Sequence, residues 1–144
     1  MNIAIIGAGL IGEKRARALP ARVNLMTICD LNETKARQLA KEFNCNFEKN
    51  WQKVIKDKKI DAMFVCTTNN YLSKIAIAAI RSGKHVLIEK PGAKNLKQLE
   101  EIAKAYQKRK VVVQFGYNHR FHPAVIKAKE IIDSKKYGDV LFMR

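Results

Sequence analysis

The sequence is short of cysteine and has few prolines. Three of its 144 residues are cysteines, at positions 29, 45 and 66, and no two of them form a Cys-x-x-Cys pair. An odd number of widely spaced cysteines argues against a disulfide framework and against a cysteine-based metal site. Cys29 and Cys66 lie in apolar runs, where a reduced thiol behaves as a small core residue. We therefore expect free thiols and no bound metal.

Long apolar runs are also missing. No stretch approaches the roughly 18 residues of a membrane-spanning helix. The amino-terminal apolar run differs from a signal peptide because three glycines interrupt it and Glu13 follows without a small-residue cleavage site. We interpret this run as a first strand and expect a cytoplasmic protein with no membrane partner.

Acidic residues are scarce: 13 of them stand against 28 lysines and arginines, which gives a formal charge of +15. Such a charge raises the possibility of nucleic-acid binding. The lysines are spread over several expected helices, however, and no aromatic and basic residues alternate to form a stacking platform. We expect no specific nucleic-acid partner. A phosphate-bearing cofactor or an anionic substrate would benefit from the same positive field.

The first twelve residues form an apolar run that ends in Gly-x-Gly-x-x-Gly. This order predicts a buried strand, a tight turn and the start of a helix from about Leu10 to Leu19. In a dinucleotide site, Gly7 permits the turn, Gly9 lets the backbone approach a pyrophosphate, and Gly12 lets the helix pack on the strand. The phosphates would lie at the helix amino end, beside Leu10 and Ile11. A glycine-rich turn without a ligand fits the triplet equally well.

A second strand, Val23 to Cys29, ends at Asp30, which follows Gly12 by 18 residues. Dinucleotide-binding folds place an acid there to accept hydrogen bonds from the adenosine ribose. An aspartate after a strand is also a common helix cap or turn residue. A carboxylate at this position would repel a 2′-phosphate, so NAD is favoured over NADP. NADP is not excluded, because Lys35 and Arg37 could compensate the charge.

The remaining chain alternates between expected strands and helices. Strands are expected at 46–47, 61–66, 85–88 and 111–115, and helices near 32–44, 51–56, 71–82 and 95–106. The run at 61–66 is apolar throughout, as in a parallel strand covered on both faces. We predict an α/β fold with a doubly wound, mostly parallel sheet in the order 3-2-1-4-5-6. Polar residues Thr67, Thr68 and Asn69 follow the fourth strand, at the edge where such sheets bind ligands.

The fifth strand leads into Glu89-Lys90-Pro91. Pro91 keeps Lys90 out of helical geometry and is a candidate for a cis peptide bond. Lys90 would then point toward the crevice expected to hold a nicotinamide, where a lysine can hydrogen-bond a substrate oxygen. A surface lysine before a turn proline is the alternative interpretation.

Two segments resemble one known family. Gly83-Lys84-His85-Val86-Leu87-Ile88-Glu89-Lys90-Pro91 and Gly116-Tyr117-Asn118-His119-Arg120-Phe121-His122-Pro123-Ala124 are similar to motifs of the Gfo/Idh/MocA oxidoreductases. The resemblance implies an NAD(P)-dependent dehydrogenase of Rossmann fold that acts on a sugar, cyclitol or related polyol, with Lys90 as the catalytic lysine. The cofactor-binding residues that it implies are Gly7, Gly9, Leu10, Ile11, Gly12, Asp30, Thr67, Thr68, Asn69, Glu89, Lys90, Asn118 and Arg120.

The sequence departs from the family pattern in one loop and in length. Thr68 stands where members often have proline, and Leu72 where a histidine is common. Members also continue for roughly another domain, which holds most of the substrate pocket. We therefore expect a dinucleotide-binding domain at 1–118 and the beginning of a truncated second domain at 119–144, with a helix from Pro123 to about Asp133 and a strand over 140–143.

Three functional hypotheses follow from these observations. The first is the cofactor-binding portion of an oxidoreductase, weak or inactive alone, in which Lys90 polarises the substrate oxygen. The second is a non-catalytic NAD(H)-binding sensor or partner subunit. The third, driven by charge, is weak and non-specific nucleic-acid association. Because the apolar segment 140–143 would be an unpaired strand, we also expect it to pair with another copy or with a companion chain.

Overall fold

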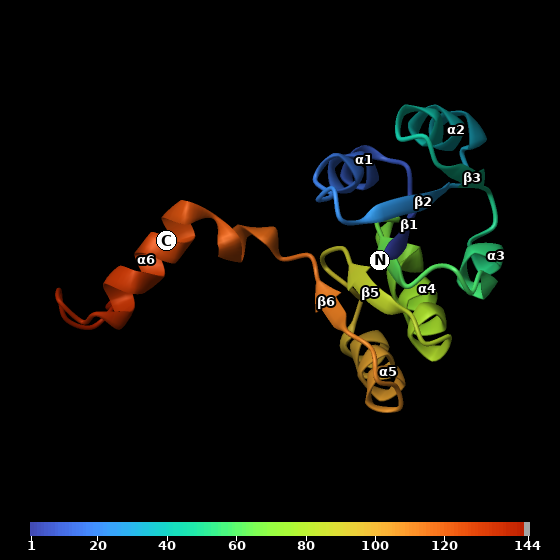
Figure 1. Cartoon of the computed structure of the whole chain (residues 1–144). Coiled ribbons are helices and arrows are strands. Elements are labelled where there is room, and N and C mark those ends of the chain that lie inside the picture. Colours follow the sequence, from blue (N-terminus) through green and yellow to red (C-terminus); the bar gives the residue numbers. More distant parts are fainter. Residues whose placement is uncertain (143–144) are drawn as a thin grey trace.

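A computed structural model describes residues 1–142 of the chain and shows a parallel sheet with helices on both faces (Figure 1). The strands lie in the order β3-β2-β1-β4-β5-β6, and each adjacent pair is parallel. This confirms the predicted doubly wound order 3-2-1-4-5-6. The strands are β1 (Asn2–Ile6), β2 (Asn24–Cys29), β3 (Asn46–Glu48), β4 (Ala62–Val65), β5 (His85–Ile88) and β6 (Val113–Phe115).

Alternate residues of β1 face two separate hydrophobic layers. Ile3 and Ile5 belong to a cluster with residues of α1 (Leu10–Arg17) and α2 (Glu33–Glu42). Ala4 and Ile6 belong to another, with residues of α3 (Trp51–Lys56), α4 (Asn69–Arg81) and α5 (Leu96–Gln107). Helices that cover both faces explain why β4, with the sequence Ala-Met-Phe-Val, is apolar at every position.

Asparagine side chains cap several of the helices, as the sequence suggests. The side chains of Asn32, Asn50 and Asn95 each accept a hydrogen bond from a backbone N–H in the first turn of α2, α3 and α5. A capping box, in which the Gln98 side chain would also accept from the backbone N–H of Asn95, forms only in part at α5. Gln98 accepts instead from the backbone N–H of Lys94 at 3.1 Å and from the hydroxyl of Ser73 at 3.0 Å, which ties α5 to α4.

The segment after β6 leaves the body of the molecule (Figure 1). It contains a short 3-10 helix, η1 (Asn118–Phe121), and then α6 (Pro123–Asp133), which has the expected bounds and no buried residue. The strand expected over 140–143 is not formed at 140–142, where the chain has no regular structure; residue 143 lies outside the described residues. A strand needs a partner, and the described residues offer none to this segment.

No helix within residues 1–142 is both long enough and apolar enough to span a membrane.

Candidate functional site

The glycine turn between β1 and α1 is closed by backbone contacts. Gly7 has φ +107°, and a Cβ there would lie 2.5 Å from the carbonyl oxygen of Cys66. A Cβ on Gly12 would lie 1.8 Å from the carbonyl oxygen of Gly7. Both positions therefore require glycine, one for its conformation and closeness to β4, the other for the approach of α1 to the turn.

Gly9 differs from these two glycines, because a Cβ built on it would meet no atom within 4 Å. Its φ of −78° is open to any residue, so nothing in the protein itself requires glycine here. The first helical hydrogen bond of α1 runs from Glu13 N–H to the Gly9 carbonyl, so the preceding amides of the first turn point out of the helix end. This open cradle beside free amides fits a pyrophosphate.

Asp30 ties the end of β2 to the glycine turn. One carboxylate oxygen accepts from Ala8 N–H at 2.7 Å and the other from Asn32 N–H at 2.8 Å. The structural interpretation of Asp30 as a turn residue is thus correct. The carboxylate also lines a cleft beside the turn, so the ligand-binding interpretation stays open.

This cleft has a volume of about 400 Å³ and lies at the carboxyl ends of β1, β2 and β4. It brings together five predicted positions, which are Gly7, Gly9, Asp30 and, from the loop after β4, Thr67 and Thr68. Asn69 is the first residue of α4 and is not part of the lining. The sequence did not point to the other eight lining residues, which are Ile6, Cys29, Leu31, Lys49, Trp51, Cys66, Tyr71 and Ile75.

Trp51 has two roles in the structure. It packs against the hydrophobic cluster below α3 and α4, and it lines the cleft. Its place directly after β3, at the same sheet edge as Asp30, is the signal that could have indicated a lining position.

Two thiols at the cleft are held in their protonated form. Burial raises the pKa of Cys29 to about 12 and that of Cys66 to about 12, and the charge of Glu89 adds to the second effect. Both cysteines lie against the sheet core, and neither is a nucleophile near neutral pH.

At the end of β5, the Glu89 side chain is buried and Lys90 is exposed. The peptide bond between Lys90 and Pro91 is cis, the form for which the sequence made Pro91 a candidate. Glu89 forms an ion pair with Arg15 of α1, whose Nε donates to Oε1 at 2.6 Å. Arg15 Nη2 also donates to Asn118 Oδ1 at 2.7 Å. Arg120 lies apart from this group, over the ring of Phe121 at 5.7 Å from its centroid.

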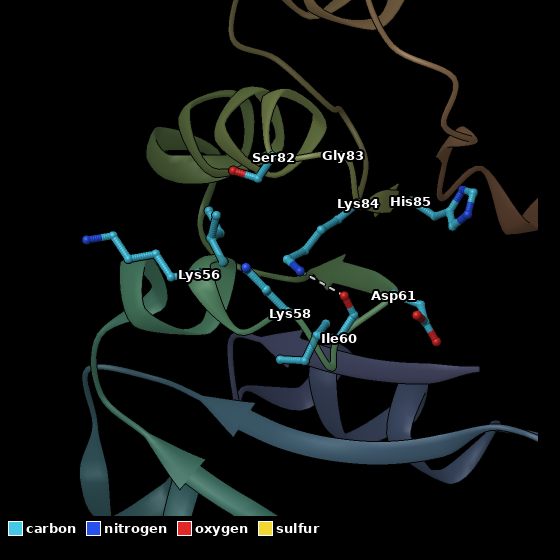
Figure 2. Close-up of a pocket in the computed structure, with 9 residues that line it drawn as sticks. Lys56, Lys58, Ile60, Asp61, Ser82, Gly83, Lys84 and His85 are labelled. Atoms are coloured by element: carbon cyan, nitrogen blue, oxygen red, sulfur yellow. Dashed lines mark hydrogen bonds between the residues drawn. The ribbon is translucent and has the colours of Figure 1, made fainter.

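The opposite edge of the sheet holds a separate pocket of about 480 Å³ (Figure 2). Lys84 extends into it from the start of β5, and its Nζ donates to the carbonyl oxygens of Asp57 at 2.7 Å and Ile60 at 2.8 Å. Burial lowers the pKa of Lys84, and the nearby carboxylates of Asp57 and Asp61 oppose that effect. The lysine thus fastens the loop between α3 and β4 to the sheet.

The fold and the glycine turn together define a dinucleotide-binding Rossmann domain, and comparison with known proteins gives its family. A sequence profile described as "Oxidoreductase family, NAD-binding Rossmann fold" (Gfo/Idh/MocA) matches residues 1–117. The chain belongs to this family, as its motifs suggest, and the match covers the NAD-binding part of it.

Two curated relatives have the same sequence identity to this chain. Levoglucosan dehydrogenase of Pseudarthrobacter phenanthrenivorans is 30% identical, over 100% of this chain and 40% of that protein. Myo-inositol 2-dehydrogenase of Thermotoga maritima is 30% identical, over 96% of this chain and 42% of that protein. The chain therefore spans about two fifths of the length of the relatives it matches.

Solved structures agree with this placement. GenD2 from gentamicin A biosynthesis, in complex with NAD, superimposes with a TM-score of 0.91 at 26% identity, over 94% of this chain and 40% of that one. Levoglucosan dehydrogenase in complex with NADH and L-sorbose gives 0.85 at 28% identity, over 94% and 39%. The relatives with named substrates are thus enzymes of sugars and cyclitols, of which this chain corresponds to the cofactor domain.

Proposed function

We propose that this chain is the NAD(P)-binding portion of an oxidoreductase that transfers hydride between nicotinamide and a sugar, cyclitol or related polyol. The observation that carries the proposal is the glycine turn, where the Cβ direction of Gly9 is open beside the free amides of α1. Gly7, Gly12, Leu10 and Ile11 would complete the pyrophosphate site.

Different residues would contact the adenosine end, the middle and the nicotinamide end of the cofactor. Asp30 would accept from the adenosine ribose, which favours NAD over NADP because a 2′-phosphate would meet its carboxylate. Thr67, Thr68 and Asn69 would contact the middle of the cofactor. Glu89, Asn118 and Arg120 would line the nicotinamide side.

Lys90 is the proposed catalytic residue. When bound, the nicotinamide supplies a hydride acceptor or donor at its C4 atom. Lys90 is exposed at the end of β5, so its ammonium group is free to hydrogen-bond the oxygen of a substrate hydroxyl or carbonyl. Polarising that oxygen favours movement of the hydride at the adjacent carbon.

Residues 119–144 would begin the second domain of such an enzyme, and the chain alone would have weak turnover or none. The proposal is supported by α6, which buries no residue and leaves Val125, Ile126, Ile131 and Ile132 exposed. A cytoplasmic location stays a prediction from the sequence.

Calorimetric titration tests the binding part of this proposal. The chain should bind NADH, and NADPH more weakly. Absence of heat with either cofactor, from protein shown to be folded by circular dichroism, would contradict it. Turnover is tested with a polyol panel and NAD⁺, where efficient oxidation by the isolated chain would contradict weak activity.

A non-catalytic NAD(H)-binding sensor or partner subunit is the second candidate. This candidate is favoured because Lys90 does not line the cleft, so a cofactor could bind there without the proposed catalytic residue. In that case Lys90→Ala would change no substrate-dependent phenotype. A loss of substrate response in this variant, measured with any companion chain present, would support the enzyme instead.

We also propose that the carboxyl-terminal segment mediates assembly with another copy or a companion chain. Val140, Leu141 and Phe142 are exposed, as are the apolar residues of α6. Light scattering of the chain with and without residues 139–144 tests this: the full chain should have the larger mass, and equal masses would argue against pairing.

A further inference from the structure

Arg15 joins three elements that are far apart in sequence. It belongs to α1, the helix that starts at the glycine turn, and its guanidinium reaches Glu89 at the end of β5 and Asn118 of η1. The two partners are 74 and 103 residues away.

The contact with Glu89 is sheltered from solvent. The Glu89 side chain is 7% exposed and that of Arg15 is 20% exposed, whereas Arg17, two residues further along the helix, is 53% exposed. A sheltered carboxylate without its cation would be costly to keep charged. Arg15 thus determines where the Glu89 carboxylate lies.

Gly116 supplies the room for this arrangement. A Cβ at this position would lie 2.9 Å from Arg15 Nη2 and 2.9 Å from Glu89 Oε2. The backbone there has no left-handed φ, so an added methyl group would not strain the backbone and would instead force the ends of the Arg15 and Glu89 side chains to shift. The ion pair and the residue after β6 are thus fitted to one another.

We propose that Arg15 is a positioning residue for the nicotinamide end of the cofactor, an inference that rests on the proposed function. Arg15 fixes Glu89 and Asn118, the two residues assigned to that end, and Lys90 follows Glu89 directly. Arg15 is part of α1, the helix whose first turn would bind the pyrophosphate. Its contact with Glu89 therefore fixes the end of β5 relative to that helix. Arg15 does not line the cleft beside Asp30, so the adenosine end is independent of it.

ADP-ribose and NADH separate the two ends, since ADP-ribose lacks only the nicotinamide. We expect Arg15→Met to weaken NADH binding about tenfold while the affinity for ADP-ribose stays within about twofold. Arg15→Lys should fall between wild type and Arg15→Met, because an ammonium retains the charge without the planar fork that reaches two partners. All affinities are measured by calorimetry on the full chain.

Two further variants complete the design. Arg17→Met is the matched control, since Arg17 lies on the same helix and pairs with Glu13 and Glu42 instead. It should leave both affinities unchanged. Gly116→Ala leaves every charge in place and displaces the pair, so it should weaken NADH binding selectively. If Arg15→Met does not fold, Arg15→Lys and Gly116→Ala still decide the question.

The outcomes separate this inference from the proposed function. A wild-type chain that binds neither NADH nor ADP-ribose overturns the proposed function and this inference with it. If the wild type binds both, equal losses of the two affinities in the Arg15 and Gly116 variants overturn the positioning role alone, and so does the absence of any loss.

Discussion

A charged side chain is buried at each end of the parallel strands, at their carboxyl ends and at their amino ends, and the two side chains have different partners. Taken as whole residues, Glu89 at the carboxyl ends of the strands is 5% exposed and Lys84 at their amino ends is 6% exposed. Lys84 donates to two backbone carbonyls of one nearby loop, whereas Glu89 is paired with the side chain of Arg15 from α1, the helix that starts at the glycine turn. A buried charge by itself therefore does not mark a binding site. Its surroundings do, and within residues 1–142 only the carboxyl ends of the strands combine the buried charge with a glycine turn and a cleft lined by Gly7, Gly9 and Asp30.

The largest effect expected is that of Gly12→Ala at the carboxyl edge. Its Cβ would meet the Gly7 carbonyl at 1.8 Å, so α1 must move away from β1, which we expect to cost about 3 kcal/mol of unfolding free energy. Gly83→Ala at the other edge is the control, because it meets no atom within 4 Å and carries only the strain of φ +78°, about 1 kcal/mol. Urea unfolding measures both, and equal losses would contradict the difference between the edges.

Lys84→Met should remove stability without affecting the cofactor. The variant leaves the carbonyls of Asp57 and Ile60 without their donor, and losing hydrogen bonds from a charged group costs about 2 kcal/mol. Chemical denaturation should show this loss, while calorimetry on the folded variant gives an unchanged NADH affinity. A large change in that affinity would show that the two edges are coupled.

Gly9→Ala should have the smallest effect on folding and a clear effect on binding. Its φ of −78° suits alanine and the added methyl meets no protein atom, so the unfolding midpoint should barely move. The methyl would occupy the space assigned to the pyrophosphate, and NADH affinity should fall by about tenfold, or 1.4 kcal/mol. Unimpaired NADH binding would place the cofactor elsewhere.

Much of the fold could be predicted because its local signals agree with its packing. The bounds of α3, β5 and α6 are those expected, since apolar spacing, capping asparagines, Gly83 and Pro123 all mark the same limits. The strand predicted for residues 140–142 was wrong for the opposite reason. Its apolar pattern favours a strand, but a strand depends on a neighbour that the pattern does not provide.

The candidate site could be predicted in its backbone and less well in its side chains. Gly7, Gly9 and Gly12 follow from spacing, because Gly7 and Gly12 meet steric demands of one turn and Gly9 leaves the space beside it open. Arg15 could not be assigned by its residue type, since arginine is usually exposed and its partners lie 74 and 103 residues away. Its position beside the buried Gly12 and Ala16 was the available sign that it faces inward.

The location of Trp51 gives the molecule an internal optical probe. It is the single tryptophan of the chain, and it contacts both the core and the cleft. Its ultraviolet emission therefore responds to unfolding and to occupancy of the cleft. Reduced nicotinamide absorbs in the range where indole emits and the oxidised form does not, so energy transfer from Trp51 would distinguish NADH from NAD⁺ without any label.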